Sequence, residues 1–114
     1  MIDFTIPEET RAVRDTVRTF VREECHPAEE TCTADNFDEV LAGLRGKARS
    51  QGLWCPFVPV EHGGMGLGPL ANALVQMELG ESFLGALSLN TQGPDDATML
   101  TLLEHGTDDQ KERF

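Results

Sequence analysis

Glycine is crowded into one short stretch of the chain, and glycine-rich loops ahead of helices can cradle phosphate with their backbone amides. Residues 63–68 read Gly-Gly-Met-Gly-Leu-Gly and precede a proline. A P-loop needs a lysine and a hydroxyl residue after its last glycine, and neither follows here. A dinucleotide fingerprint needs a βαβ unit, which this sequence does not predict. The stretch is therefore interpreted as a structural turn, with anion binding through its amides as the alternative.

The other residues that could do chemistry are scattered along the chain. The three histidines stand singly, so no nucleophile–base arrangement with a recognisable spacing can be assembled from them. Cys25, Cys32 and Cys55 contain no CxxC pair, which argues against a disulfide framework and favours a reducing compartment, the cytoplasm. Cys25, His26 and Cys32 lack the second ligand pair of a structural zinc site, so no metal is expected.

The charge balance restricts the partners of this chain. Twenty acidic residues against nine Lys and Arg give a net charge of −11 over 114 residues. Nucleic acids and anionic membranes require clustered cations, so neither is expected as a partner. The largest basic group, from Arg45 to Arg49, is too small to be named as an anion site. No apolar run approaches the roughly 18 residues that span a bilayer, and no signal peptide is expected.

Apolar residues recur at helical spacing, and no segment alternates as a strand does. A first helix is expected to begin near Pro7 and to end at His26-Pro27, because the residue before a proline avoids the helical region. A surface loop should follow over 28–35. A second helix, capped by Asp35 or Asn36, should then stop at Gly52.

The third helix is expected to start at Pro69, where a missing N–H costs nothing. It is apolar nearly all the way round, and such a helix belongs at the centre of a fold, packed on several sides. Glu78 is its carboxylate most suited to approach the interior, although a place at the helix margin is favoured.

The remaining sequence predicts a short segment after Gly85, a helix that begins near Pro94, and a last helix opened by the capping-box spacing of Thr107 and Gln110. Because that helix reaches barely two turns by Phe114, the sequence is interpreted as truncated before a further domain. The expected fold is all-α, an orthogonal or up-down bundle of about five to six helices, forming one domain over residues 1–114.

Three stretches occur in an order that resembles a known family. Residues 51–68 are similar to a G-L…P-E-x-G-G-x-G-L signature, with Val60 in the place of the usual proline. Residues 77–80 resemble an x-E-E-L/I-G helix, with Met77 in place of the first acid, and residues 106–114 match G-S/T-x-x-Q-K-x-R/K-F/Y/W. Together they resemble the N-terminal helical domain of the acyl-CoA dehydrogenase family.

The resemblance implies an FAD flavoprotein of fatty acid metabolism that oxidises an acyl-CoA thioester to the 2,3-enoyl-CoA. In that family the flavin lies between a β-domain and a C-terminal helical domain, which commonly supplies the glutamate base. This chain ends before either domain, so no catalytic, cofactor-binding or metal residue is assigned, and these residues alone are expected to be inactive and to bind no flavin. The resemblance also implies a homo-oligomer, and an electron-transfer flavoprotein or similar acceptor.

In the family this domain covers the flavin site and helps to line the acyl pocket. The residues that correspond here are Asn90, Thr91, Gly93, Pro94 and Ala97. The segment looks closer to a subgroup with P-D-x-x-x-M than to straight-chain enzymes, which leaves the acyl chain length open. The alternative function is a non-enzymatic helical module that docks on a partner protein through an exposed apolar face. Both functions predict such a face on this chain.

Overall fold

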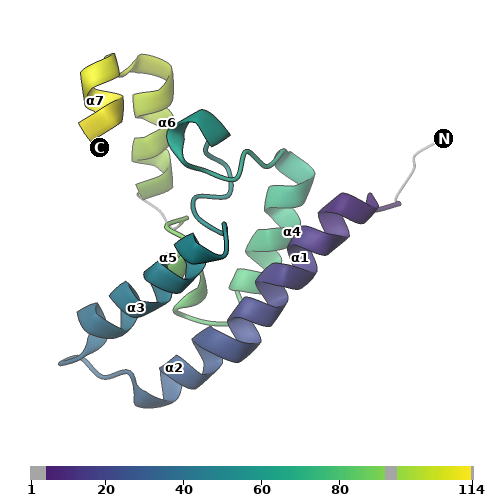
Figure 1. Ribbon diagram of the computed structural model, residues 1–114, viewed down its shortest axis with the longest axis vertical. Helices are drawn as coiled ribbons and strands as arrows, with labels where there is room; N and C mark the ends of the chain where they lie inside the picture. The colour runs from purple at the N-terminus through teal and green to yellow at the C-terminus, as the bar shows by residue number, and fades with distance from the viewer. Residues whose placement is uncertain (1–4, 92–94, 114) are drawn as a thin grey trace.

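The computed structural model describes residues 5–91 and 95–113, and every regular element within those ranges is helical. The prediction of an all-α fold is confirmed. Figure 1 shows α4 alongside the long N-terminal helix, and α6 and α7 as a helical pair at the far end of the molecule. The elements are α1 (Glu8–Phe20), η1 (Val21–Cys25), α2 (His26–Thr31), α3 (Phe37–Ser50), η2 (Val60–His62), α4 (Pro69–Leu79), α5 (Gly85–Ser88), α6 (Asp95–His105) and α7 (Asp108–Arg113).

The first helix does not end at His26-Pro27, so that prediction is wrong. The chain passes through a π turn, η1, and continues without a break into α2, where the loop over 28–35 was expected. The backbone N–H of His26 donates to the carbonyl of Val21, five residues earlier. A π turn holds one extra residue, so the helix passes the proline ring without its usual clash with a preceding carbonyl.

Most local signals at other helix ends are confirmed. Asn36 occupies the N-cap position of α3, but its side chain makes no capping hydrogen bond and instead accepts from the N–H of Thr33 over 2.6 Å. Gly52 terminates that helix with a φ of +74°. The N–H of Leu53 donates to the carbonyl of Ala48 over 2.8 Å, which completes a Schellman motif. Thr107 and Gln110 form the predicted capping box, each side chain accepting from the other's backbone N–H at 3.2 and 2.9 Å.

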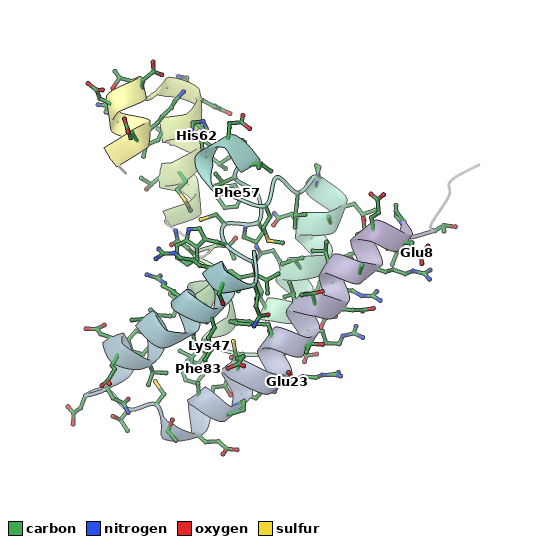
Figure 2. The ribbon with its side chains drawn as sticks, viewed as in Figure 1. Glu8, Glu23, Lys47, Phe57, His62 and Phe83 are labelled. Carbon is green, nitrogen blue, oxygen red and sulfur yellow. The ribbon has the colours of Figure 1, made fainter. Side chains whose placement is uncertain are left out.

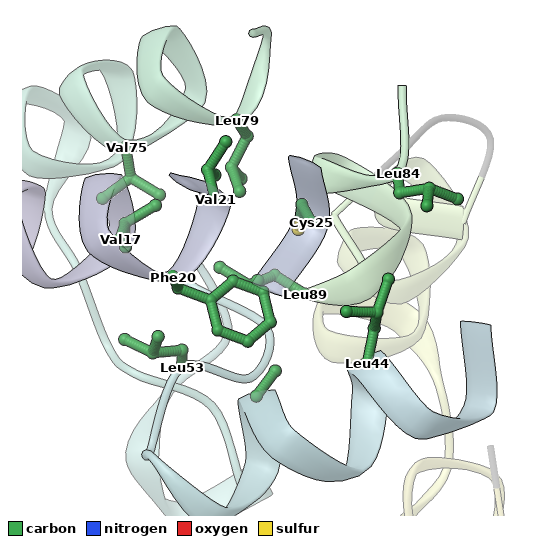
Figure 3. Close-up of a cluster of buried hydrophobic side chains, with 11 residues drawn as sticks. Val17, Phe20, Val21, Cys25, Leu44, Leu53, Val75, Leu79, Leu84 and Leu89 are labelled. Carbon is green, nitrogen blue, oxygen red and sulfur yellow. The ribbon is translucent and has the colours of Figure 1, made fainter. Parts of the chain in front are cut away.

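The core lies between α1, α3 and α4, and it is built from the apolar stripes of those helices. The aromatic ring of Phe20 lies in the middle of this cluster (Figure 3). Complete burial of a side chain of this size contributes about 1.5–3 kcal/mol to folding. The buried members are Val17, Phe20, Val21, Cys25, Leu44, Ala48, Leu53, Val75, Leu79, Leu84 and Leu89.

Helix α4 is not the central helix that its composition predicts. Val75 and Leu79 are buried against α1, but Leu70 is 52% and Met77 71% exposed, and Phe83 beyond the helix is 63% exposed. Within the described chain, the outer face of α4 therefore presents apolar side chains to solvent. None of the helices in residues 5–91 and 95–113 is both long and apolar enough to cross a membrane.

The molecule is a flat slab, measuring 46 × 40 × 22 Å. Its thickness equals about two helix diameters. Its radius of gyration is 14.9 Å, against about 13 Å for a compact domain of this length. Its accessible surface is 7432 Å², about a fifth more than the ~6,200 Å² expected for a compact protein of its mass. Both quantities indicate a chain that is less compact than a typical domain of its length.

Candidate functional site

The glycine-rich loop (residues 58–69) directs its amides inward to its own chain. All six backbone N–H groups from His62 to Leu67 donate to carbonyls between Cys55 and Val60, over 2.8–3.2 Å. An anion cradle requires N–H groups that are free to point at a ligand. The loop therefore does not fit a phosphate or the pyrophosphate of a flavin at these amides, and the structural-turn interpretation is the one that its geometry supports.

The glycines of this loop are required by its backbone path. Gly63 and Gly66 have φ values of +89° and +66°, which side-chain-bearing residues rarely adopt. A Cβ on Gly64 would overlap the carbonyl oxygen of Val58 and would lie 2.5 Å from the Val58 Cβ. The loop closes on itself at this contact, and it delivers the chain to Pro69 at the start of α4.

Two non-glycine residues also adopt positive φ, and they contact each other. Cys55 has a φ of +48° and Asn90 a φ of +56°. The N–H of Cys55 donates to the carbonyl of Leu89 over 2.9 Å, and Asn90 Nδ2 lies 3.5 Å from Cys55 Sγ. Burial raises the pKa of the Cys55 thiol, so the group is a neutral packing partner. Such strained backbone persists only where the surrounding contacts hold it, and here it joins the loop entrance to the segment after α5.

Helix α5 and the segment after it are held on two further sides. Arg45 Nε, from α3, donates to the carbonyl of Leu87 over 2.9 Å. Gln76 Nε2, from α4, donates to Thr91 Oγ1 over 2.8 Å, and Thr91 is 5% exposed. Sequence reasoning identified Asn90 and Thr91 but missed Arg45 and Cys55, because their partners are about 35 to 42 residues away along the chain. The tolerance of asparagine for positive φ was the one local signal.

Neighbouring candidate residues face different hollows. Asn90 lines a hollow of about 270 Å³ near α6 and α7, whereas Thr91 lines a second hollow of about 400 Å³ near α4. Ala97 is exposed and lines neither of them. Gly93 and Pro94 lie outside the described residues. Asn90 and Thr91 are therefore adjacent in the sequence, but their side chains line different hollows.

The hollow at Thr91 combines apolar and polar walls. Phe57 and Leu100 supply apolar surface, while Asn72 and Gln76 of α4 join Thr91 as the polar side. Figure 2 shows Phe57 on the side of the molecule that carries η2 and α6. Because Gln76 and Thr91 already satisfy each other, an apolar guest would not leave either of these two groups without a hydrogen bond.

Glu78 reaches the interior margin of α4 and forms an ion pair there. Arg18 Nη2 and Nε, from α1, both donate to Glu78 Oε1, at 2.7 and 3.1 Å. Hydrogen bonding to the Arg18 guanidinium lowers the pKa of the Glu78 carboxyl, which is 9% exposed. A carboxylate held ionised by an arginine is a weak proton acceptor, so Glu78 links α1 to α4 and is not suited to act as a general base.

The thiols and acids of the chain form no further reactive cluster within the described residues. Cys25, Cys32 and Cys55 are all free thiols, and Cys25 is buried among core side chains. Across residues 5–91 and 95–113, no three His, Cys, Asp or Glu side chains gather closely enough to hold a metal ion.

Comparison with known proteins matches nearly the whole chain. A family model described as "Acyl-CoA dehydrogenase, N-terminal domain" matches residues 7–114. "Acyl-CoA dehydrogenase family member 11" of Gallus gallus is 30% identical over an alignment 109 residues long, and the match covers 86% of this chain and 14% of that protein. "Isovaleryl-CoA dehydrogenase, mitochondrial" of Pongo abelii is 28% identical, covering 96% of this chain and 26% of its own length. This chain therefore spans about a quarter or less of these relatives. No solved structure gave a significant match.

Proposed function

The chain belongs to the acyl-CoA dehydrogenase family, whose N-terminal domain it matches over residues 7–114, and we propose that it works as that domain of a flavin-dependent enzyme. The reaction would be oxidation of an acyl-CoA thioester to the 2,3-enoyl-CoA, with bound FAD as the hydride acceptor. Glu78 is not suited to act as a general base and the amides of residues 62–67 are occupied. We therefore assign this domain the role of contacting the acyl chain and covering the flavin site. The β-domain and the C-terminal helical domain would complete the site.

The family match over residues 7–114 carries the proposal, and the exposed apolar outer face of α4 agrees with it. Leu70 and Met77 are seven residues apart, so they lie on the same side of the helix, and both are more than half exposed. An exposed apolar face of this kind marks a surface that another protein layer covers. The flat shape and the excess of accessible surface agree with that reading. In the proposed enzyme, the covering layer is the remainder of the same protein.

The hollow at Thr91 is the part of this chain that we assign to the acyl pocket. It borders the same helix, with Asn72 and Gln76 placed between the buried and the exposed faces of α4. An acyl chain would contact Phe57 and Leu100 and would gain from apolar burial, about 0.8 kcal/mol for each buried methylene. Thr91 is thus the best supported of the candidate substrate residues, while Asn90, Gly93, Pro94 and Ala97 stay predictions.

The test is a spectrum of the native gene product, purified from its source and sized by mass spectrometry. We expect a flavin absorption band that is bleached when an acyl-CoA thioester is added without oxygen. A series of thioesters of increasing chain length would then identify the substrate. A colourless product with the mass of the 114-residue chain would overturn the proposal. It would favour instead a helical module that docks on a partner through the face of α4.

A further inference from the structure

The hollow near α6 and α7 is cationic, although the chain as a whole carries a charge of −11. Its walls come from the last turn of α3, from η2, from α6 and from α7. Arg49, His62 and Lys111 are its ionisable lining residues other than the Cys55 thiol, and no Asp or Glu contributes to the described lining. Figure 2 shows His62 on η2 beside α6. Three separate elements thus direct basic side chains to one place.

Neither strong cation of this hollow is neutralised within the described chain. The ion pairs formed by described residues involve neither Arg49 nor Lys111. The Arg49 guanidinium instead lies over the ring of Trp54, with its carbon 4.1 Å from the ring centroid. Stacking fixes the plane of a guanidinium and leaves its N–H edge able to donate to an anion. A basic residue in the last turn of α3 also favours the helix dipole, but this does not account for Lys111 on α7.

Apolar side chains also line the hollow. Val58, Met99, Leu102 and Leu103 contribute to its walls, together with the Asn90 amide. With a volume of about 270 Å³, the hollow suits a compact ligand that has one charged end and one apolar end.

We propose that this hollow binds a compact organic carboxylate, an aromatic or short aliphatic acid. The carboxylate accepts hydrogen bonds from Arg49 and attracts Lys111, and the apolar body packs against the α6 side chains. This site is independent of the proposed acyl-CoA dehydrogenase function, because none of its evidence rests on the family or on the hollow at Thr91.

The probe is benzoate, and benzamide is its matched control, because both have nine non-hydrogen atoms but only benzoate is charged. Each is titrated into the full 114-residue chain at low salt and followed by amide NMR. We expect saturable shifts with benzoate at the Trp54 indole and at the amides of Leu102 and Leu103, and no saturation with benzamide. Arg49→Gln and Lys111→Gln should each weaken benzoate binding about tenfold, the effect of losing one charged partner.

The control variant is Arg22→Gln, which removes the same charge from the exposed surface of η1. It should bind benzoate as the unaltered chain does. Equal binding of benzamide, an equal loss in Arg22→Gln, or shifts confined to other parts of the chain would each overturn the proposal, as would no saturable binding. If Arg49→Gln does not fold, Lys111→Gln on α7 decides the question, because Lys111 forms no ion pair among the described residues.

Discussion

Replacing Gly64 with alanine tests whether the glycine-rich loop is a structural turn. The new Cβ would overlap the carbonyl oxygen of Val58, which also accepts the N–H of Gly66 over 2.8 Å. Val58 is 5% exposed, so neither its backbone nor its side chain can turn away. Overpacking costs about 1–3 kcal/mol and a lost hydrogen bond about 1 kcal/mol more. We therefore expect Gly64→Ala to lower the free energy of unfolding by about 3 kcal/mol.

The matched control is Gly68→Ala in the same loop. A Cβ on Gly68 meets no atom within 4 Å, and its φ of −74° and ψ of 174° suit alanine. Alanine stabilises the fold by making the unfolded chain less flexible, and it destabilises the fold because it is a poorer N-cap for α4 than glycine. These effects nearly cancel, so we expect the free energy of unfolding to change by no more than about 0.5 kcal/mol.

Urea unfolding followed by far-UV circular dichroism measures both variants, and thermal unfolding should show a drop of about 10 °C for Gly64→Ala. Equal stability of the two variants would refute the steric argument. Saturable amide NMR shifts of residues 62–67 on addition of inorganic phosphate would contradict the claim that the loop amides are occupied.

Three further predictions address the ion pair, the proposed pocket and the exposed face. Arg18 lowers the folded-state pKa of Glu78, so the pair stabilises the fold above the ordinary glutamate pKa of about 4.3, and this contribution is lost as the pH falls through the lower, folded-state pKa. In urea titrations, the stability of Glu78→Gln should therefore differ most from that of the unaltered chain at neutral pH. A pH-independent difference would count against the pair. Thr91→Val leaves Gln76 Nε2 without its 2.8 Å acceptor, so in the native enzyme it should change the ratio of kcat/KM between short and long acyl-CoA thioesters, whereas an unchanged ratio would remove Thr91 from the pocket. Met77→Lys, at a position that is 71% exposed, should alter the stability of the 114-residue chain by no more than about 0.5 kcal/mol. It should weaken association with the domains that we propose to cover α4, measured by size-exclusion chromatography. Equal association would place the covering layer elsewhere.

The helix ends show which parts of the fold are determined by the local sequence. Gly52 stops α3, and Thr107 with Gln110 opens α7, as their spacing predicted. A capping interaction involves residues within a few positions of each other, so the sequence near it contains the necessary information. Pro27 failed as a stop signal because the burial of Val21 and Cys25 against the core holds η1 in place and carries the helix past the proline.

The candidate site depended on contacts that no local pattern contains. Cys55 and Asn90 lie 35 residues apart, and only the packed structure brings them together at positive φ. The same packing turns Asn90 and Thr91 to different hollows, although the sequence placed both in one pocket.

By itself, the sequence determined an all-helical chain, most helix boundaries and the turn at the glycine-rich loop, because periodicity, caps and glycine conformations act over short distances. Only the tertiary structure decided which face of each helix is covered. Helix α4 is apolar on nearly every side, yet α1 buries one side and leaves Leu70 and Met77 exposed. The hydrophobic effect favours burial of any apolar surface but is not directional, so it does not specify which element covers that surface. The packing of the elements decides that.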